Sequence, residues 1–307
     1  MRVRLIDVDG SLPGQPPLAA AIAQGWGQRV DMTALGPSLR LWARRVAIAD
    51  AAASLRQAGA PPGHGVVVNF LGSGDFHHLA ALLIGQIDEP VTVVHFDNHP
   101  DWVRFAPDYH CGSWVNRVLE MEHVRRVITI GPCSDDLRNP QLKGGNIAAL
   151  ATGKLELYPW RHDPSRVWGR ADPGASGDRR GHYIAWRNVG DDFGAFVAQL
   201  LDRLPTEAVW VSIDKDVLRP ADALTNWDQG EMPLDALTEA LRLIGQRARI
   251  VGLDVCGEYS PPRHRLWSKR WEAWADQPRP PRVEPADLAR NAHANAALLA
   301  ALQGVRP

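Results

Sequence analysis

Two segments of this chain place acidic side chains two residues apart, directly after apolar runs. The first is Asp97-Asn98-His99-Pro100-Asp101 and the second is Asp214-Lys215-Asp216. An apolar run that stops on acidic residues is typical of a parallel strand that leaves the core at the carboxyl edge of its sheet. Four carboxylates gathered there would repel one another strongly unless cations held them together. The pattern therefore predicts a site for two divalent metal ions.

The alternation of ligand types narrows the choice of metal. In an extended segment, Asp97, His99 and Asp101 point the same way. Carboxylate together with imidazole suits Mn²⁺, Zn²⁺ or Ni²⁺ better than Ca²⁺, which prefers oxygen ligands alone. Each segment by itself has a structural alternative, a turn for the first and a helix N-cap for the second. Two such segments in one chain favour the metal site.

Two further segments follow apolar runs and could complete a site. Gly72 to His78 contains two glycines that allow a sharp turn and a close approach of the backbone. Either His77 or His78 could supply another ligand, although a lone histidine is usually not a ligand. Glu258 follows the last apolar run and could pair with a cationic substrate group, with a surface carboxylate as the alternative.

The elements that must position these residues alternate between short β-branched runs and helical patterns, which predicts a mainly parallel sheet. The predicted strands are Val3–Asp7, Val66–Leu71, Val91–Phe96, Val127–Ile130, Leu155–Tyr158, Val209–Ile213 and Ile250–Asp254. The predicted helices are Leu41–Ala58, His77–Gln86, Ser113–Glu122, Phe193–Leu204, Leu234–Gln246 and Ala286–Gln303. Irregular excursions near residues 161–188 and 261–285 are typical of lids or interfaces. No repeat or linker divides the chain, so we expect residues 1–307 to form a single domain.

The composition argues against several classes of protein. The 307 residues carry a formal net charge of −1 with a sequence pI near 6.8, which gives no sign of a nucleic-acid or membrane partner. The 3 cysteines are too few for a disulfide framework. The first residues read as a strand instead of a signal peptide, and no apolar run approaches the roughly 20 residues that span a bilayer. We therefore expect a cytoplasmic protein.

Taken in order, these motifs resemble those of the ureohydrolases, the family of arginase and agmatinase, which hydrolyse a guanidino group at a dinuclear Mn²⁺ centre. The family's D-A-H-x-D segment is matched by Asp97 to Asp101, and its S-x-D-x-D segment by Ser212 to Asp216. Its G-G-D-H-S segment is matched loosely by Gly72 to His78, and its last acidic residue by Glu258. The resemblance implies a three-layer α/β/α fold with a mainly parallel sheet of about eight strands.

The resemblance also implies a role for each matched residue. One metal would be held by His77, Asp97, Asp101 and Asp214, and the second by His99, Asp97, Asp214 and Asp216. Two Mn²⁺ ions are expected, with Ni²⁺, Co²⁺ or Zn²⁺ as alternatives. They would supply hydroxide from water near neutral pH. Glu258 would hold the guanidinium, and His110 would shuttle protons.

The chain departs from the family where arginases bind the α-carboxylate of free arginine. The loop from Trp102 to Tyr109 is short and aromatic, and Thr225 to Gly230 replaces a Gly/Thr/Pro-rich segment. We therefore expect an arginine carried in a peptide, converted to ornithine with release of urea. Agmatine and guanidinobutyrate are the close alternatives. The candidate substrate contacts beside Glu258 are Trp102, Trp227 and Asp228.

Other readings of the chain stay open. Trp267, Trp271 and Trp274 crowd one segment, where we expect packing or a homo-oligomer interface ahead of substrate contact. A zinc-dependent amide hydrolase of the deacetylase type would need one metal and not two. A non-catalytic relative would be expected to lack a ligand.

Overall fold

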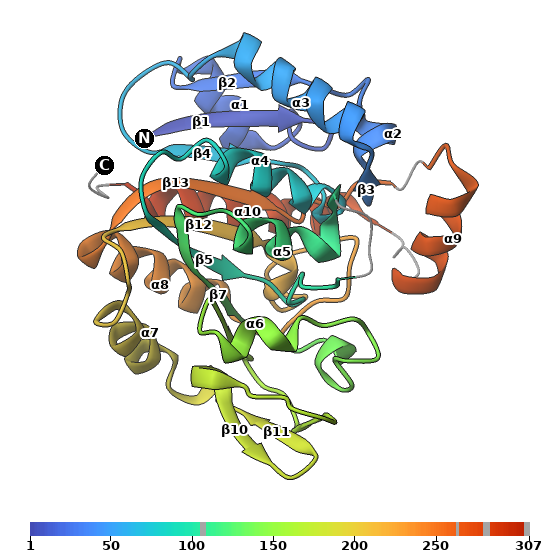
Figure 1. Ribbon diagram of the computed structural model, residues 1–307. Helices are drawn as coiled ribbons and strands as arrows, with labels where there is room; N and C mark the ends of the chain where they lie inside the picture. The colour runs from blue at the N-terminus through green and yellow to red at the C-terminus, as the bar shows by residue number, and fades with distance from the viewer. Residues whose placement is uncertain (105–108, 262–263, 279–282, 304–307) are drawn as a thin grey trace.

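The computed structural model describes residues 1–104, 109–261, 264–278 and 283–303. Its central sheet is built from β1 (Arg2–Asp7), β2 (Gly27–Asp31), β4 (Val67–Phe70), β5 (Val91–Phe96), β7 (Val124–Ile130), β8 (Leu155–Tyr158), β12 (Ala208–Asp214) and β13 (Arg249–Cys256). The strands lie in the order β2-β1-β4-β13-β12-β5-β7-β8, and every neighbouring pair is parallel (Figure 1). The predicted mainly parallel sheet of about eight strands is confirmed, and it includes all of the predicted strands.

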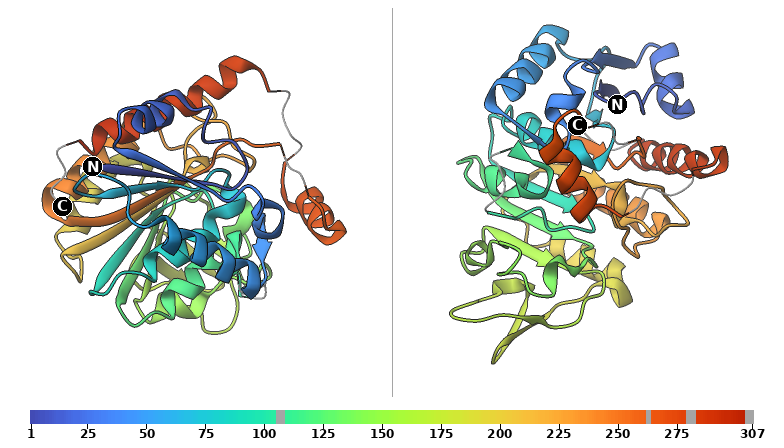
Figure 2. Two further views of the ribbon diagram at one scale, coloured as in Figure 1. Left: turned by 90° about the horizontal axis from the view of Figure 1, so that it is seen from above. Right: turned by 90° about the vertical axis from the view of Figure 1, so that its right-hand side faces the viewer.

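Helices cover both faces of the sheet, because the side chains of a buried strand alternate between two apolar layers. In β12, Val209, Val211 and Ile213 belong to one core cluster and Trp210 to the other. The first layer contains α1 (Pro16–Ala23), α7 (Phe193–Leu201), α8 (Leu234–Arg247) and α10 (Pro285–Ala301). The opposite layer contains α3 (Arg45–Ala58), α4 (Ala80–Ile84), α5 (Trp114–Leu119) and α6 (Ile147–Ala151). Figure 2 shows α1 and α10 together on one face and α3 on the other, so the three-layer fold is confirmed.

Some elements escape the sequence patterns. The missed strand β2 lies at the edge of the sheet, where only Val30 is fully buried, so no apolar alternation marks it. The missed helices are α1, α2 (Gly36–Leu39), α6 and α9 (Trp267–Asp276). The helices α1, α2 and α6 are short, so their apolar periodicity is weak. The helix α9 carries its tryptophans on the face turned away from the core, so its aromatic pattern does not mark a buried face.

Two predicted helices have different bounds in the structure. The helix expected from Leu41 begins at Arg45, because Trp42–Ala43 (β3) forms an antiparallel pair with Tyr109–His110 (β6). The helix expected over 77–86 is divided into a 3₁₀ segment, η1 (Gly74–Leu79), followed by α4. Residues 105–108, within the loop whose departure from arginases is noted above, lie outside the described residues.

Both irregular excursions contain regular structure. Within 161–188, β9 (Ser165–Arg166), β10 (Gly177–Arg180) and β11 (Tyr183–Trp186) form a small antiparallel sheet. Within 261–285, α9 lies beyond the carboxyl ends of the central strands (Figure 1). Its tryptophans at 267, 271 and 274 share one helix face and are 79%, 63% and 79% exposed. They therefore do not pack against the described core.

The order of the strands decides where the candidate ligands meet. The chain passes from β4 to β5 and later returns to place β12 and β13 between them. The carboxyl ends of β4, β12 and β5 consequently lie close together, although the residues that follow them are far apart in the sequence. Across the described part of the chain, no helix has the length and apolar character required to cross a bilayer.

Candidate metal centre

The register of the sheet brings the two acidic segments together. Ile213 of β12 is paired with Phe96 of β5, so Asp214 and Asp97 leave the sheet side by side. Glycines pack against the Asp214 carboxylate: a Cβ atom on Gly74 would lie 2.5 Å from Oδ2, and one on Gly257 would lie 2.4 Å from Oδ1. These close approaches hold a buried carboxylate at the carboxyl edge of the sheet.

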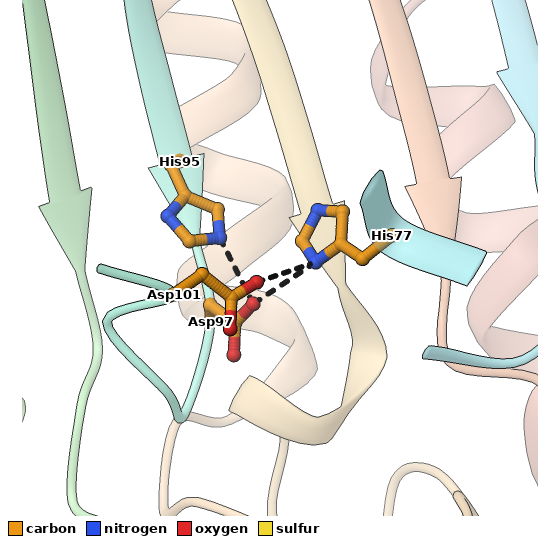
Figure 3. Close-up of side chains that lie close together, drawn as sticks. All are labelled: His77, His95, Asp97 and Asp101. Carbon is orange, nitrogen blue, oxygen red and sulfur yellow. Dashed lines mark hydrogen bonds and ion pairs between the residues drawn. The ribbon is translucent and has the colours of Figure 1, made fainter. Parts of the chain in front are cut away.

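His77 is at the centre of the first group of candidate ligands (Figure 3). Its Nδ1 lies 3.1 Å from an oxygen of Asp97 and 3.3 Å from an oxygen of Asp101. A third oxygen, Oδ2 of Asp214, is 3.7 Å away. The ring is held from its other side, where Nε2 lies 2.8 Å from the hydroxyl of Ser212. The imidazole is therefore fixed with one nitrogen directed at three carboxylates.

This arrangement fits a shared cation. The buried Nδ1 of His77 has no hydrogen-bond partner of good geometry among the residues that the structure describes. Two ligands that lie about 2.1 Å from an ion, at right angles to each other, are about 3.0 Å apart. That separation matches the contacts of Nδ1 with Asp97 and Asp101. An ion bound by all of these groups would satisfy the nitrogen and offset the charge of the carboxylates.

A second group is formed by Asp97, His99 and Asp216. Nδ1 of His99 lies 3.0 Å from an oxygen of Asp216 and 3.5 Å from Oδ1 of Asp97. Nε2 of the same ring lies 3.0 Å from Oδ1 of Asp228. A carboxylate on the second nitrogen of a ligating histidine fixes the ring and raises its basicity. Asp228, expected as a substrate contact, is thus placed to orient His99.

His95 joins the first group from within β5, although the sequence analysis does not identify it (Figure 3). Its Nε2 lies 2.9 Å from Oδ2 of Asp97, and its Nδ1 lies 3.1 Å from the hydroxyl of Thr129. With the hydroxyl donating to Nδ1, the proton on Nε2 is directed at the carboxylate that belongs to both groups. His95 therefore orients Asp97 from below the cavity.

The buried carboxylates repel one another. Burial raises the pKa of Asp101 to about 6, and the charge of Asp97 adds to this effect. Burial and the Asp97 charge also raise the pKa of Asp214, and burial together with Asp214 and Asp97 raises the pKa of Asp216 well above its usual value. Without bound cations the cluster therefore favours protons on several of its carboxylates. Divalent ions would replace those protons.

Histidines supply the opposing charge. Burial acts to raise the pKa of Asp97, but the neighbouring imidazoles of His77, His95 and His99 hold that pKa well below the usual value. Burial likewise acts to lower the pKa of His77, yet Asp101 and Asp97 hold it well above the usual value. The same balance of burial against carboxylates raises the pKa of His99. The centre is thus a dense set of charges that cations can stabilise.

Asp101 is held in an unusual backbone conformation. Its φ is +48°, in the left-handed region that few non-glycine residues adopt. The indole Nε1 of Trp114 donates to its Oδ2 at 2.6 Å, and the backbone N–H of Val115 donates to its carbonyl at 3.2 Å. Strained residues of this kind are concentrated at functional sites. Here the conformation turns the carboxylate back towards His77.

A cavity of about 700 Å³ opens above the two groups. Its wall includes the candidate ligands His77, Asp97, His99, Asp101, Asp214 and Asp216. Beyond them the lining carries five further carboxylates, those of Asp135, Asp136, Asp228, Glu272 and Asp276. Lys143 also lines the cavity, but its ammonium is already ion-paired with Asp136 at 2.8 Å. The cavity therefore favours a cationic ligand.

Two other predicted residues lie on this wall. Trp227 lines the cavity with its ring edge-on to His99, the ring centroids being 5.7 Å apart. His110 lies opposite, and its Nδ1 accepts a hydrogen bond of 2.9 Å from the backbone N–H of Gly112. Its Nε2 lies 2.5 Å from Oε1 of Glu272. Because Nδ1 is an acceptor, the neutral imidazole carries its proton on Nε2, directed at Glu272.

Two of the expected substrate contacts lie elsewhere. Trp102 is 1% exposed and packs in the core beside Gly145, so it does not form a wall of the cavity, and that expectation is corrected. Glu258 is also 1% exposed and does not belong to the cavity lining. Its carboxylate forms a buried ion pair with Lys215. The cation that pairs with Glu258 is therefore Lys215 of the chain itself and not a substrate guanidinium.

The positions of the two adjacent histidines differ. His77 belongs to the candidate ligand groups, whereas His78 is fully buried and neither of its ring nitrogens has a hydrogen-bond partner among the described residues. Burial lowers the pKa of His78 well below the usual value, so it is neutral. Of the two alternatives, the geometry favours His77 as the ligand.

Some of the missed residues leave a signal in the sequence. A histidine within the otherwise apolar run of β5 marks His95, and a lysine between two aspartates after a fully buried strand marks Lys215. Glu272 has no local signal, because its position beside His110 depends on how α9 docks.

The sequence was compared with protein families and with known proteins. No family model matches the chain. An uncharacterised protein of Thermotoga maritima is 29% identical over 194 residues, which are 63% of this chain and 59% of that protein. The chain therefore spans about three fifths of the length of this curated relative.

Solved structures agree over nearly the whole chain. Arginase from Bacillus cereus has a TM-score of 0.59 at 12% identity and covers 99% of both chains. Formimidoylglutamase from Bacillus subtilis has a TM-score of 0.58 at 16% identity, covering 99% of this chain and 86% of that one. At such identities the likeness establishes a shared fold, so the expected arginase-like fold is confirmed.

Proposed function

We propose that this chain is a ureohydrolase that converts a guanidino group into urea and an amine with the help of two divalent metal ions. The observation that carries the proposal is the unpartnered Nδ1 of His77, buried among three carboxylates beneath an acidic cavity. The shared fold and the order of the motifs support it. The second group around His99 supports two ions in preference to the single zinc of a deacetylase-type site.

The residues that would hold the ions follow from the two groups. His77, Asp97, Asp101 and Asp214 would bind one ion, and His99, Asp97, Asp214 and Asp216 the other. Mn²⁺ is the metal that we propose. A guanidinium is stabilised by resonance, so neutral water barely attacks it. Bound ions would convert water into hydroxide, a stronger nucleophile, near neutral pH.

The chain's own residues would direct the substrate and a proton. The acidic wall draws the cationic guanidinium into the cavity and repels carboxylates. When the carbon–nitrogen bond breaks, the departing amine must gain a proton. The attacking water releases that proton, and the His110–Glu272 pair at the cavity wall is placed to transfer it to the amine.

The charge of the cavity bears on which guanidino compound enters. Among the described residues of the lining, Lys143 is the only lysine or arginine, and its pairing with Asp136 leaves little to attract the α-carboxylate of free arginine. An arginine inside a peptide has no such carboxylate, because its α-groups are in amide bonds. The volume of about 700 Å³ is in the upper half of the ~300–1,000 Å³ range of ligand sites, which leaves room for flanking backbone. We therefore propose peptide-borne arginine as the substrate and ornithine as the product residue.

Urea release by the Mn²⁺-loaded protein tests the proposal. The substrates to compare are free arginine, agmatine, guanidinobutyrate and an arginine peptide with both ends blocked. We expect the blocked peptide to be turned over fastest and guanidinobutyrate, with its carboxylate, slowest. Faster turnover of free arginine would contradict the peptide assignment, and urea from agmatine alone would move it to small amines. No urea from any of them, with two metals bound, would refute the reaction itself.

A further inference from the structure

The carboxylate of Glu258 has no capacity left for a substrate. Oε1 accepts hydrogen bonds from Lys215 and from Asn295, the latter at 2.7 Å. Oε2 accepts from Gln15 at 3.1 Å and from Asn291 at 2.9 Å. A carboxylate has about four acceptor positions, and these four donors fill them. Since Glu258 is also buried outside the cavity, a guanidinium has no way to reach it without unfolding this network.

Glu272 of α9 differs in each of these respects. It belongs to the cavity lining, and its side chain is 23% exposed. Oε1 faces Nε2 of His110 at 2.5 Å, and Oε2 accepts from the indole of Trp42 at 2.9 Å. The described residues place one donor on each oxygen, which leaves about two of the four acceptor positions without a donor among them. A guanidinium offers donors in a planar fork that suits a carboxylate with open positions.

Two other acidic residues of the wall already have partners, and neither Asp135 nor Asp276 is among the described contacts of the His110 ring. Asp228 accepts from His99 and from the side chain of Asn98, at 3.0 and 3.2 Å. Asp136 is paired with Lys143. Glu272 is therefore the wall carboxylate that both contacts the proton-transfer candidate and has room for a further ligand.

The docking of α9 gives Glu272 a fixed position. Lys269 lies one turn before it, is fully buried, and donates to the backbone carbonyls of Pro37, Ser38 and Trp42. At the end of the helix, Gln277 donates to Asp75 at 2.5 Å. A carboxylate held in this way needs little reorganisation when a substrate binds.

From these contacts we propose that Glu272, and not Glu258, holds the substrate guanidinium beside His110. The proposal rests on the guanidino hydrolysis proposed above. In this arrangement Lys215 and Glu258 form a structural ion pair, and the segment that carries α9 contributes the residue that recognises the charge.

Kinetics on Mn²⁺-loaded variants test the assignment. The probes are acetylarginine amide as substrate and acetylcitrulline amide, its uncharged analogue, as competitive inhibitor. We expect Glu272→Gln to raise the KM for the arginine probe by about 10- to 100-fold, because a hydrogen-bonded charge pair is lost. The inhibition constant of the citrulline probe should not change, so preference for the charged probe is lost. Mn²⁺ content and unfolding midpoint, measured on the same samples, should match those of the parent protein.

Two further variants complete the design. Glu258→Gln, assayed at a temperature below the midpoint of its thermal unfolding, should retain the KM of the parent protein for the arginine probe. Glu239→Gln, an exposed change of the same type on α8, is the matched control. An unchanged KM in Glu272→Gln with a reduced kcat would mean that Glu272 only positions His110, and the assignment would be refuted. A raised KM in folded Glu258→Gln would refute it as well.

The outcomes separate this inference from the proposed function. If the parent protein releases no urea from the arginine probe, the peptide-type substrate is refuted, and calorimetric titration of the loaded protein with both probes still decides the binding role. A preference for the arginine probe that Glu272→Gln abolishes would support the assignment. A preference that survives in Glu272→Gln would overturn it. Should Glu272→Gln be poorly folded, Glu272→Asp keeps the charge but shortens its reach and is expected to weaken binding less.

Discussion

Replacement of Glu258 by Gln separates a structural role from a substrate-binding role most sharply. In the structure its carboxylate neutralises Lys215, which is fully buried. Gln keeps the size of the side chain, and with its oxygen at the Oε1 position it can still accept from Asn295. Its –NH2 group would then face the donor Asn291, and the ammonium of Lys215 would be left without a counter-charge. Breaking one side of a buried ion pair typically costs about 3–5 kcal/mol. Because the amide oxygen and Asn295 remain near Lys215, we expect about 3 kcal/mol.

That loss is large enough to measure by thermal unfolding. With an unfolding entropy of roughly 2.1 cal/mol/K for each of the 307 residues, 3 kcal/mol lowers the midpoint by about 5 °C. Circular dichroism on the Mn²⁺-loaded protein would record it. Glu239→Gln, which is exposed and removes the same charge, should shift the midpoint by less than about 1 °C.

A double variant tests whether the ion pair itself is the cause. Lys215→Met combined with Glu258→Gln removes both charges, and such replacements are often close to neutral. We expect the double variant to be more stable than Glu258→Gln alone. If the two single losses simply add, the residues are not coupled and the structural ion pair is refuted.

Three shorter predictions concern the metal centre. Asp97→Ala or Asp214→Ala should remove both Mn²⁺ ions in elemental analysis, and retention of two ions would overturn the ligand sets. Asp228→Asn should weaken Mn²⁺ binding by about 10- to 100-fold, since the orientation of His99 is lost; equal affinity in a metal titration would contradict this. Chelation should lower the unfolding midpoint more at pH 7 than at pH 5. Burial raises the pKa of Asp101 to about 6, so without metal its charge costs about 3 kcal/mol above that pH. The cost falls progressively below pH 6 and disappears only near the unfolded-state pKa of about 4, so it is roughly halved at pH 5, and equal shifts would refute this account.

Much of the fold could be predicted because its central strands are buried on both faces. Runs such as Val91–Phe96 and Val209–Ile213 are continuous and apolar, and their bounds agree with the structure to within one residue. The edge strand β2 could not be found, since one buried valine gives no periodicity. The helices α3, α7, α8 and α10, each of nine residues or more, were predicted, whereas the missed helices α1, α2 and α6 have eight residues or fewer. The docked position of α9 depends on polar contacts of Lys269 with backbone carbonyls, which leave no apolar pattern in the sequence.

The candidate ligands were accessible from the sequence because they lie at or shortly after the ends of three central strands, β4, β5 and β12. Their positions are set by local chain direction and by strand order, and both can be read from periodicity together with the resemblance. The substrate-facing residues depend instead on side-chain partners that are distant in the sequence. Trp102 follows an Asp ligand directly, yet its side chain turns into the core beside Gly145. Adjacency to a motif therefore predicts proximity to the metal centre but not exposure to its cavity.

The lysine between Asp214 and Asp216 links these observations. As η6 (Lys215–Val217) follows β12, its first side chain is directed to α10, where it meets Glu258 and Asn295. A fully buried ammonium is stable only with a partner, and Glu258 is the carboxylate that supplies one. Once Glu258 is engaged in this way, recognition of a substrate cation has to come from a different part of the chain. The excursion near 261–285 brings Glu272 to the cavity and anchors it through Lys269. In the arrangement that we propose, Lys215 occupies Glu258 at the end of a core strand, and Glu272 on the docked helix α9 would recognise the substrate charge.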